Sequence, residues 1–191
     1  MLENLAKYNI ILASGSPRRK ELLRGIGLNF RVELIKDIEE SYPSYLPVEE
    51  IPVYLSKLKA HAYHANANDL IITADTVVIL DGKVIGKPAD ASEARLMLSA
   101  LSWKVHKVVT GVTISTVDRK VSFSCASEVE FAPLTDEEID YYITHYHPFD
   151  KAGSYGIQEW IGYVGIKGIH GSFYNVMGLP VQRLYAVLKT F

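Results

Sequence analysis

The chain contains few of the features that assign a sequence to a specialised class. Cys125 is its single cysteine, which excludes an intramolecular disulfide and suits a reducing compartment. No stretch approaches the ~20 apolar residues that a membrane-spanning helix needs. The sequence has no internal repeat, low-complexity tract or linker. We therefore predict a single domain over residues 1–191, long enough to bury a substantial core.

The chain also lacks an excess of charge of either sign. Its formal net charge is -2, with hydrophobic residues at 48% and charged residues at 22%. This composition is typical of a folded protein. It provides no overall basic field to attract nucleic acid, so an anion site would have to be local. Residues 1–9 include Glu3 and no long apolar core, which argues against a signal peptide. We expect a cytoplasmic protein.

The usual nucleotide-binding motifs are missing too. There is neither a Gly-Lys-Ser/Thr P-loop nor a Gly-x-Gly-x-x-Gly fingerprint. Instead, a predicted strand over 8–13 leads through a small-residue turn to Ser16, a good helix N-cap, and Pro17, which suits the first helical position. Arg18 and Arg19 then oppose the helix dipole. A bound polyanion would explain two arginines there, and the alternative is a solvated basic turn with weak surface ion pairs.

A second informative stretch is the apolar strand predicted over 70–80, which contains Asp75. Apolar residues on both sides of Asp75 indicate burial on both faces of a sheet. A buried carboxylate is costly unless it meets a cation, a metal ion or hydrogen-bond donors. Such carboxylates are enriched at functional sites, and a structural ion pair is the alternative.

Residues 81–82, Asp-Gly, predict a tight hairpin after this strand. A two-residue turn pairs Leu80 with Lys83, and the same register places Thr76 opposite Lys87. The face that each side chain takes depends on that register. An acid, a hydroxyl and a lysine at the base of one hairpin would suit a charged substrate.

Two further candidates lie between these stretches. The apolar spacing predicts a helix over 48–65, with Lys59 beside its apolar stripe and Lys57 on the opposite side. Lys59 either points into a groove or extends from the edge of the core. In the preceding polar loop, Glu39 and Glu40 are either solvated charges or oxygen ligands for a magnesium-like ion.

In the C-terminal half, predicted loops, strands and helices also follow one another. Residues 149–158 form a glycine-containing segment ending in Gln158, whose amide could read a base edge by hydrogen bonding; an ordinary loop is the alternative. Glycine spacing predicts a strand over 162–169, and a final helix follows 178–180. Interleaved strands, hairpins and helices predict an α/β fold with a mixed sheet and flanking helices.

Several blocks of the sequence, in order, resemble the Maf family of nucleoside triphosphate pyrophosphatases. They are Ala-Ser-Gly-Ser-Pro-Arg-Arg at 13–19, Lys-Ala at 59–60, Ala-Asp-Thr-Val-Val at 74–78, Gly-Lys-Pro at 86–88, Lys-Ala-Gly-Ser-Tyr-Gly-Ile-Gln at 151–158 and Val-Met-Gly-Leu-Pro at 176–180. Together they cover almost the whole chain, and their compatible spacing makes the resemblance specific.

The resemblance implies a fold, a reaction and a set of site residues. The fold would be inosine-triphosphate-pyrophosphatase-like, with two lobes around a nucleotide cleft. A nucleoside triphosphate and water would give the monophosphate and pyrophosphate, with a divalent metal cation, Mg or Mn. The implied catalytic residues are Asp75, Lys59 and Lys87; the substrate-binding residues are Ser14, Arg18, Arg19, Thr76 and Gln158; the metal ligands are Glu40 and Asp75.

The resemblance also indicates the substrate. Thr76 after the catalytic acid, together with the block at 151–158, marks the branch of the family that acts on dTTP and UTP, and modified pyrimidine nucleotides are included as candidates. The alternative function is a nucleotide-binding regulator of cell division without essential turnover. The expected partner is the nucleoside triphosphate, with no nucleic acid and no membrane, and a homodimer is left open.

Overall fold

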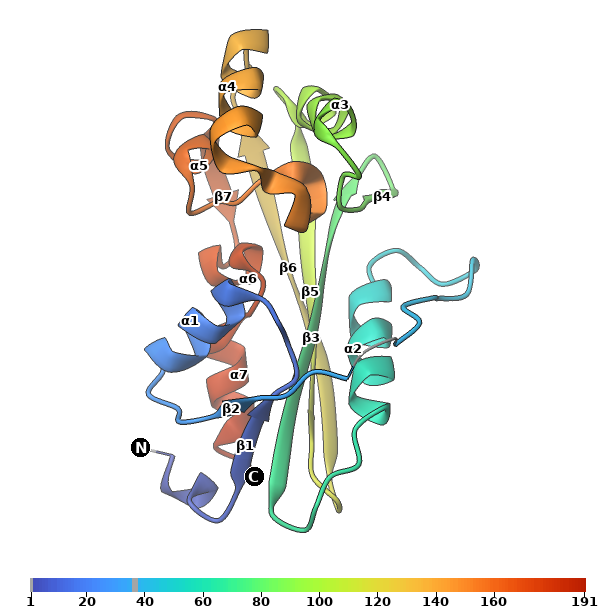
Figure 1. The fold of residues 1–191 in the computed structure, drawn as a ribbon, viewed down its shortest axis with the longest axis vertical. Helices are drawn as coiled ribbons and strands as arrows, with labels where there is room; N and C mark the ends of the chain where they lie inside the picture. Colours follow the sequence, from blue (N-terminus) through green and yellow to red (C-terminus); the bar gives the residue numbers. More distant parts are fainter. Residues whose placement is uncertain (1, 36–37) are drawn as a thin grey trace. The chain divides into compact units, whose positions relative to one another are not determined.

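A mixed sheet runs through the protein. The structure, a computed structural model, describes residues 2–35 and 38–191. Within these residues the strand order is β2-β1-β3-β5-β6-β7, and β4 pairs with β3. The bounds are β1 Asn9–Leu12, β2 Arg31–Val32, β3 Asp69–Leu80, β4 Lys83–Ile85, β5 Val105–Ser115, β6 Lys120–Phe131 and β7 Ile166–His170 (Figure 1). β1 pairs in parallel with β2 and β3, whereas the β3–β4 and β6–β7 pairs are antiparallel. The predicted mixed sheet is therefore confirmed.

The helices begin where the sequence supplies caps. Ser16 accepts a hydrogen bond from the backbone N–H of Arg19, with Pro17 in the first turn, as predicted. Asp90 caps α3 in the same way, and Thr135 forms a capping box with Glu138. The helices are α1 Pro17–Gly25, α2 Ile51–His61, α3 Ala91–Leu101, α4 Asp136–Tyr146, α5 Trp160–Val164, α6 Phe173–Met177 and α7 Val181–Leu188, and the 3₁₀ turns are η1 Glu3–Leu5, η2 Pro148–Asp150 and η3 Ala152–Ser154.

Contacts divide the chain into two compact units. Unit 1 consists of Met1–Asp75, Thr110–Cys125 and Gly178–Phe191, and unit 2 of Thr76–Val109 and Ala126–Met177. Strands β3, β5 and β6 each contribute residues to both units. The single domain over 1–191 stays a prediction.

Each unit buries its own apolar side chains. In unit 1, α2 lies on one side of β3 and β5, and α1 and α7 lie on the other (Figure 1). Ile11, Leu12 and Ile72 from the strands and Leu23 from α1 are almost inaccessible there. In unit 2, α3 packs on α4 and on the 3₁₀ turns η2 and η3. The helix residues buried there include Leu98, Leu101 and Tyr142.

Three sequence predictions need correction. The predicted strand over 162–169 is wrong in its first part, since helix α5 ends at Val164 before β7 begins. The predicted helix over 48–65 is shorter, Ile51–His61. The hairpin pairs Leu80 with Lys83 as predicted, but the ladder ends at Val78 and Ile85. Lys87 therefore lies beyond β4 and is not a strand partner of Thr76.

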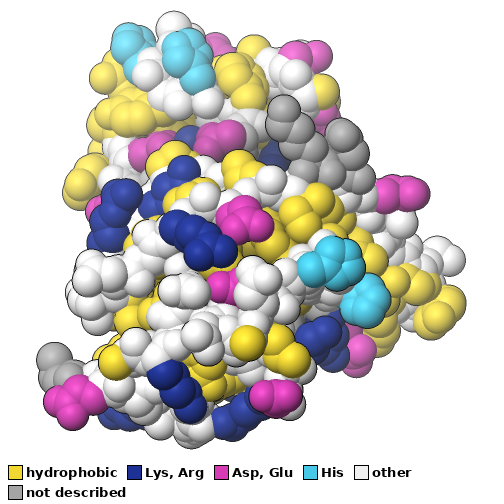
Figure 2. Space-filling model, turned by 60° about the horizontal axis from the view of Figure 1, so that its bottom comes forward, with side chains coloured by type: hydrophobic (Ala, Val, Ile, Leu, Met, Phe, Trp, Pro, Cys, Tyr) yellow, Lys and Arg dark blue, Asp and Glu magenta, His cyan; other side chains and the backbone are white. Residues whose placement is uncertain are grey.

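Two further properties of the structure agree with the composition. No helix in the described part of the chain combines the length and apolar character required to cross a membrane. On the face drawn in Figure 2, basic and acidic side chains lie interspersed, as the net charge of -2 suggests.

Candidate functional site

The residues singled out in the sequence are distributed over both units. Unit 1 contains Ser14, Arg18, Arg19, Glu40, Lys59 and Asp75, and unit 2 contains Thr76, Lys87 and Gln158. In unit 1, hydrogen bonds and ion pairs bring most of these side chains together.

Asp75 has a cationic partner, one of the three kinds that its buried position allows. It lies in the middle of β3, and its side chain is only 13% exposed. The Lys59 ammonium group donates to Asp75 Oδ1 at 2.7 Å. The two side chains come from α2 and β3, and Lys57 is exposed. Of the two lysines, Lys59 is therefore the one that contacts the sheet.

Glu40 completes an acid–lysine–acid cluster. Its Oε2 lies 2.9 Å from Lys59 Nζ, and its side chain is 51% exposed. One ammonium group therefore pairs with two carboxylates, one enclosed in the sheet and one at the surface. Asp75 and Glu40 thus share one ammonium group, and the charges of both carboxylates also act on the nearby guanidinium group of Arg19.

Close packing of α2 on the sheet positions Lys59. A Cβ on Gly111 of β5 would lie 2.2 Å from the backbone nitrogen of Val53, so only glycine allows this approach. One turn before Lys59, the Ser56 hydroxyl lies 2.8 Å from that of Thr113. Thr73, two residues before Asp75 on β3, donates to the Ser56 carbonyl at 2.7 Å. Residues 73 and 75 share one face of the strand, so these contacts align Lys59 with Asp75.

Arg19 holds three segments of unit 1 together. Its Nε donates to the Gly178 carbonyl at 2.8 Å, and its Nη1 donates to the Ala74 carbonyl at 2.8 Å and to Ser14 Oγ at 3.2 Å. Ser14 itself is buried and accepts a bond from Ser16 N–H. Arg19 therefore fixes the turn after β1 and the backbone next to Asp75.

Burial and neighbouring charges both affect the pKa of Arg19. The residue as a whole is half-buried, whereas its guanidinium group lies deeper. Burial is the main cause that lowers the pKa of Arg19, and the neighbouring charge of Arg18 adds to it. The carboxylates of Asp75 and Glu40 act in the opposite direction. Arg18 and Arg19 thus crowd positive charge at the start of α1.

In unit 2 the predicted residues have different surroundings. Lys87 is exposed, and Thr76 is half-buried on β3. Gln158 is half-buried in the turn before α5, and its Oε1 is buried without a hydrogen bond from the described residues. A buried amide oxygen of this kind costs free energy unless a ligand or water supplies a donor.

Few of the described side chains could serve together as metal ligands. Among the described residues, no group of three or more His, Cys, Asp or Glu side chains converges as a metal site would. Glu40 and Asp75 converge on Lys59 Nζ and so supply two carboxylates. Magnesium is often held by one or two carboxylates, with substrate phosphates and water completing its coordination.

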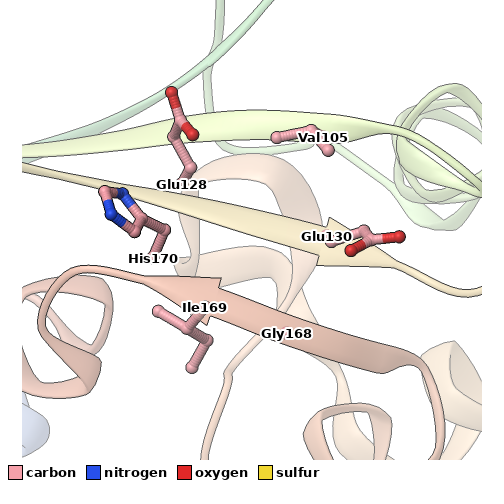
Figure 3. Close-up of a pocket in the computed structure, with 6 residues that line it drawn as sticks. All are labelled: Val105, Glu128, Glu130, Gly168, Ile169 and His170. Carbon is pink, nitrogen blue, oxygen red and sulfur yellow. The ribbon is translucent and has the colours of Figure 1, made fainter.

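A separate pocket lies in unit 2 and contains none of the predicted site residues. It is lined by Val105, Glu128, Glu130, Gly168, Ile169 and His170 (Figure 3). Glu128 and His170 face each other across the β6–β7 pair. The residues that line it include two carboxylates and neither lysine nor arginine, so this lining suits a triphosphate poorly.

Comparison with known proteins identifies the family. The family model described as "Maf-like protein" matches residues 9–191. The chain belongs to the Maf-like protein family. A Maf-like relative from Phocaeicola vulgatus, named dTTP/UTP pyrophosphatase, is 61% identical, with 99% of each chain covered. A relative of the same name from Parabacteroides distasonis is 58% identical, with 100% of each chain covered.

Solved structures support the fold of this Maf-like protein. The Ham1 protein of Staphylococcus aureus matches with a TM-score of 0.53 and 17% identity, covering 95% of this chain and 98% of that one. The predicted α/β fold, with its mixed sheet and flanking helices, is confirmed, and it is similar to the fold of this Ham1 protein.

Some residues that shape the site were not predicted from the sequence of this Maf-like protein. Ser56, Thr73 and Gly111 position α2, yet none of them carries a motif. A signal was available only for Gly111, because an isolated glycine inside a strand often marks close approach of another backbone.

Proposed function

We propose that this protein hydrolyses dTTP and UTP to the monophosphate and pyrophosphate. Relatives named dTTP/UTP pyrophosphatase are 51–61% identical over nearly the whole chain, which supports this activity and this substrate class. The observation that carries the chemistry is the enclosed Asp75 carboxylate, paired with Lys59 beside the arginines of α1.

The unit 1 residues are suited to the reacting end of the substrate. Asp75 either accepts a proton from the attacking water or holds that water through the metal ion. Lys59 stabilises the ionised carboxylate and contributes positive charge. Arg18 binds phosphate oxygens, for which a guanidinium group has matching geometry, and Ser14 offers a hydroxyl. Arg19 was predicted as a substrate ligand, and its bonds to Ala74, Gly178 and Ser14 add a role in positioning that turn.

We propose Mg²⁺ or Mn²⁺ as the cofactor. The oxygen donors of Asp75 and Glu40 are of the type that these ions prefer, and both lie within 3 Å of the same ammonium nitrogen. The two carboxylates would hold the ion together with substrate phosphates. When bound, the ion supplies charge neutralisation and lowers the pKa of a coordinated water.

The unit 2 residues are assigned by their chemistry and by the family motif. Lys87 neutralises charge that builds on the pyrophosphate leaving group. Gln158 reads the edge of the pyrimidine ring through its amide. Thr76 contributes a hydroxyl to substrate binding. We predict no nucleic-acid or membrane partner. A cytoplasmic location also stays a prediction, and a homodimer is left open.

Product analysis tests the proposal. The protein is incubated with Mg²⁺ or Mn²⁺ and separately with UTP, dTTP, CTP, GTP, ATP and 7-methyl-GTP, and the products are resolved. We expect monophosphate and pyrophosphate, with the highest kcat/KM for UTP and dTTP. Diphosphate and phosphate would contradict the proposed cleavage position. Nucleotide binding without any product would instead favour the regulatory alternative, for which no feature of the structure argues specifically.

A further inference from the structure

A closed ring of hydrogen bonds surrounds Gln158 in unit 2. The backbone N–H of Gly156 donates to Tyr142 Oη at 2.9 Å, and Tyr142 Oη donates to Glu159 Oε2. The backbone N–H of Glu159 donates back to the Gly156 carbonyl at 2.9 Å. Both ends of the four-residue turn 156–159, which carries Gln158, are therefore tied to one tyrosine of α4.

A buried lysine fixes the second oxygen of Glu159. Lys151 is only 7% exposed, and its Nζ lies 3.2 Å from Glu159 Oε1 and 2.7 Å from Asp150 Oδ1. Removing one partner from a buried ion pair is costly because the other charge is left uncompensated. Glu159 is therefore held at both oxygens, one by Lys151 and the other by Tyr142.

Glu159 also lies directly over the backbone of the turn. A Cβ on Gly156 would come within 2.7 Å of Glu159 Cδ, so the carboxyl group occupies the space above that glycine. The only polar side-chain atom of residues 156–159 that is buried without a partner among the described residues is Gln158 Oε1. The turn is thus rigid, and it presents one unsatisfied acceptor.

We propose that Glu159, clamped by Lys151 and Tyr142, is a positioning residue that sets pyrimidine selectivity by fixing the amide of Gln158. This inference rests on the proposed function, in which Gln158 reads the base. A fixed Oε1 acceptor matches N3–H of uracil or thymine, whereas N3 of cytosine carries no hydrogen. A site built around an acceptor rejects a ligand that lacks the matching donor. Loosening the turn should therefore reduce discrimination between UTP and CTP.

The test compares kcat/KM for UTP and CTP in the full-length protein with Mg²⁺. We expect Glu159→Ala to raise KM for UTP and to lower the UTP/CTP ratio about tenfold, the change that loss of one oriented hydrogen bond produces. Glu159→Gln and Tyr142→Phe keep the shape of the side chains, and we expect each to lower the ratio a few-fold. Glu130→Gln removes the Lys167 ion pair of the same unit and should leave the ratio unchanged.

A double-mutant cycle separates positioning from general stability. If Glu159 acts through Gln158, Glu159→Ala should not lower the UTP/CTP ratio further in a Gln158→Ala background. A loss of folded protein would instead reduce turnover of both nucleotides equally. A wild-type UTP/CTP ratio in Glu159→Gln and Tyr142→Phe would overturn the inference, whereas absence of turnover in the wild type would overturn the proposed function.

Discussion

The two units hold their polar residues in different ways. In unit 1, Lys59 pairs with one enclosed carboxylate and with Glu40 at the surface, so part of the cluster remains open to solvent and ligand. In unit 2, Lys151 and Glu159 are enclosed and tied through Tyr142 to a rigid turn. The first arrangement suits the formation of ion pairs with a charged substrate, and the second suits a fixed recognition surface. Substitutions of the carboxylates that pair with Lys59 should therefore change turnover more than stability, and substitutions around Glu159 should change stability and selectivity.

The largest expected effect is on turnover, at Asp75. Asp75→Asn should reduce kcat at least about 10³-fold, because loss of a positioned base or metal ligand removes a dominant contribution. The fold should persist, since Glu40 still pairs with Lys59. Steady-state kinetics with UTP and a thermal melt measure the two effects. Near-normal activity in this variant would refute the role of Asp75.

A buried histidine in unit 2 should make stability depend on pH. His106 bonds Tyr155 Oη through Nε2 at 2.7 Å. Its burial lowers its pKa from 6.5 to about 4. As pH falls from 6.5 towards 4, the unfolded chain binds a proton that the folded chain does not, so stability is lost across that window. The difference amounts to about 3 kcal/mol in the free energy of unfolding.

Denaturant titrations at several pH values measure this contribution. His106→Gln should flatten the pH dependence between 4 and 6.5. His64→Gln, at an exposed position of unit 1, is the control and should retain the wild-type slope. Equal slopes in wild type and His106→Gln would mean that His106 is not the titrating group.

Local patterns and the energetic cost of burial could be read from the sequence, whereas tertiary packing could not. The strand over 70–80, the Ser16 cap and the need of the Asp75 carboxylate for a partner are local or energetic signals. The structure has the strand as Asp69–Leu80, the cap at Ser16, and Lys59 as the partner of Asp75. The first part of the strand over 162–169 was predicted wrongly because glycine spacing alone does not distinguish a strand from the short helix α5, in which a Cβ at position 162 would lie 1.8 Å from the Ile157 carbonyl oxygen. The ring through Tyr142 joins two segments of the chain by tertiary packing, which no local pattern encodes.

Gly111 tests the close packing of α2 on the sheet that positions Lys59. Gly111→Ala places a methyl group against the backbone of α2 and should destabilise the fold by about 1–3 kcal/mol. Movement of α2 should also displace Lys59 and lower kcat. Gly25→Ala at the end of α1, where a Cβ meets no atom within 4 Å, serves as the control. A wild-type melting temperature for Gly111→Ala would contradict the close packing.

The smallest expected effect is at Arg18 and distinguishes it from its neighbour. Arg18→Ala should raise KM for UTP about tenfold, as expected for loss of one charge-assisted contact to phosphate. Arg19→Ala should instead lower the melting temperature and kcat together, because its bonds to Ala74 and Gly178 are lost. Arg24→Ala, exposed on the same helix, is the matched control. If Arg18→Ala leaves KM and kcat unchanged, Arg18 is not a phosphate ligand, and the positive charge at the start of α1 must be explained by Arg19 alone.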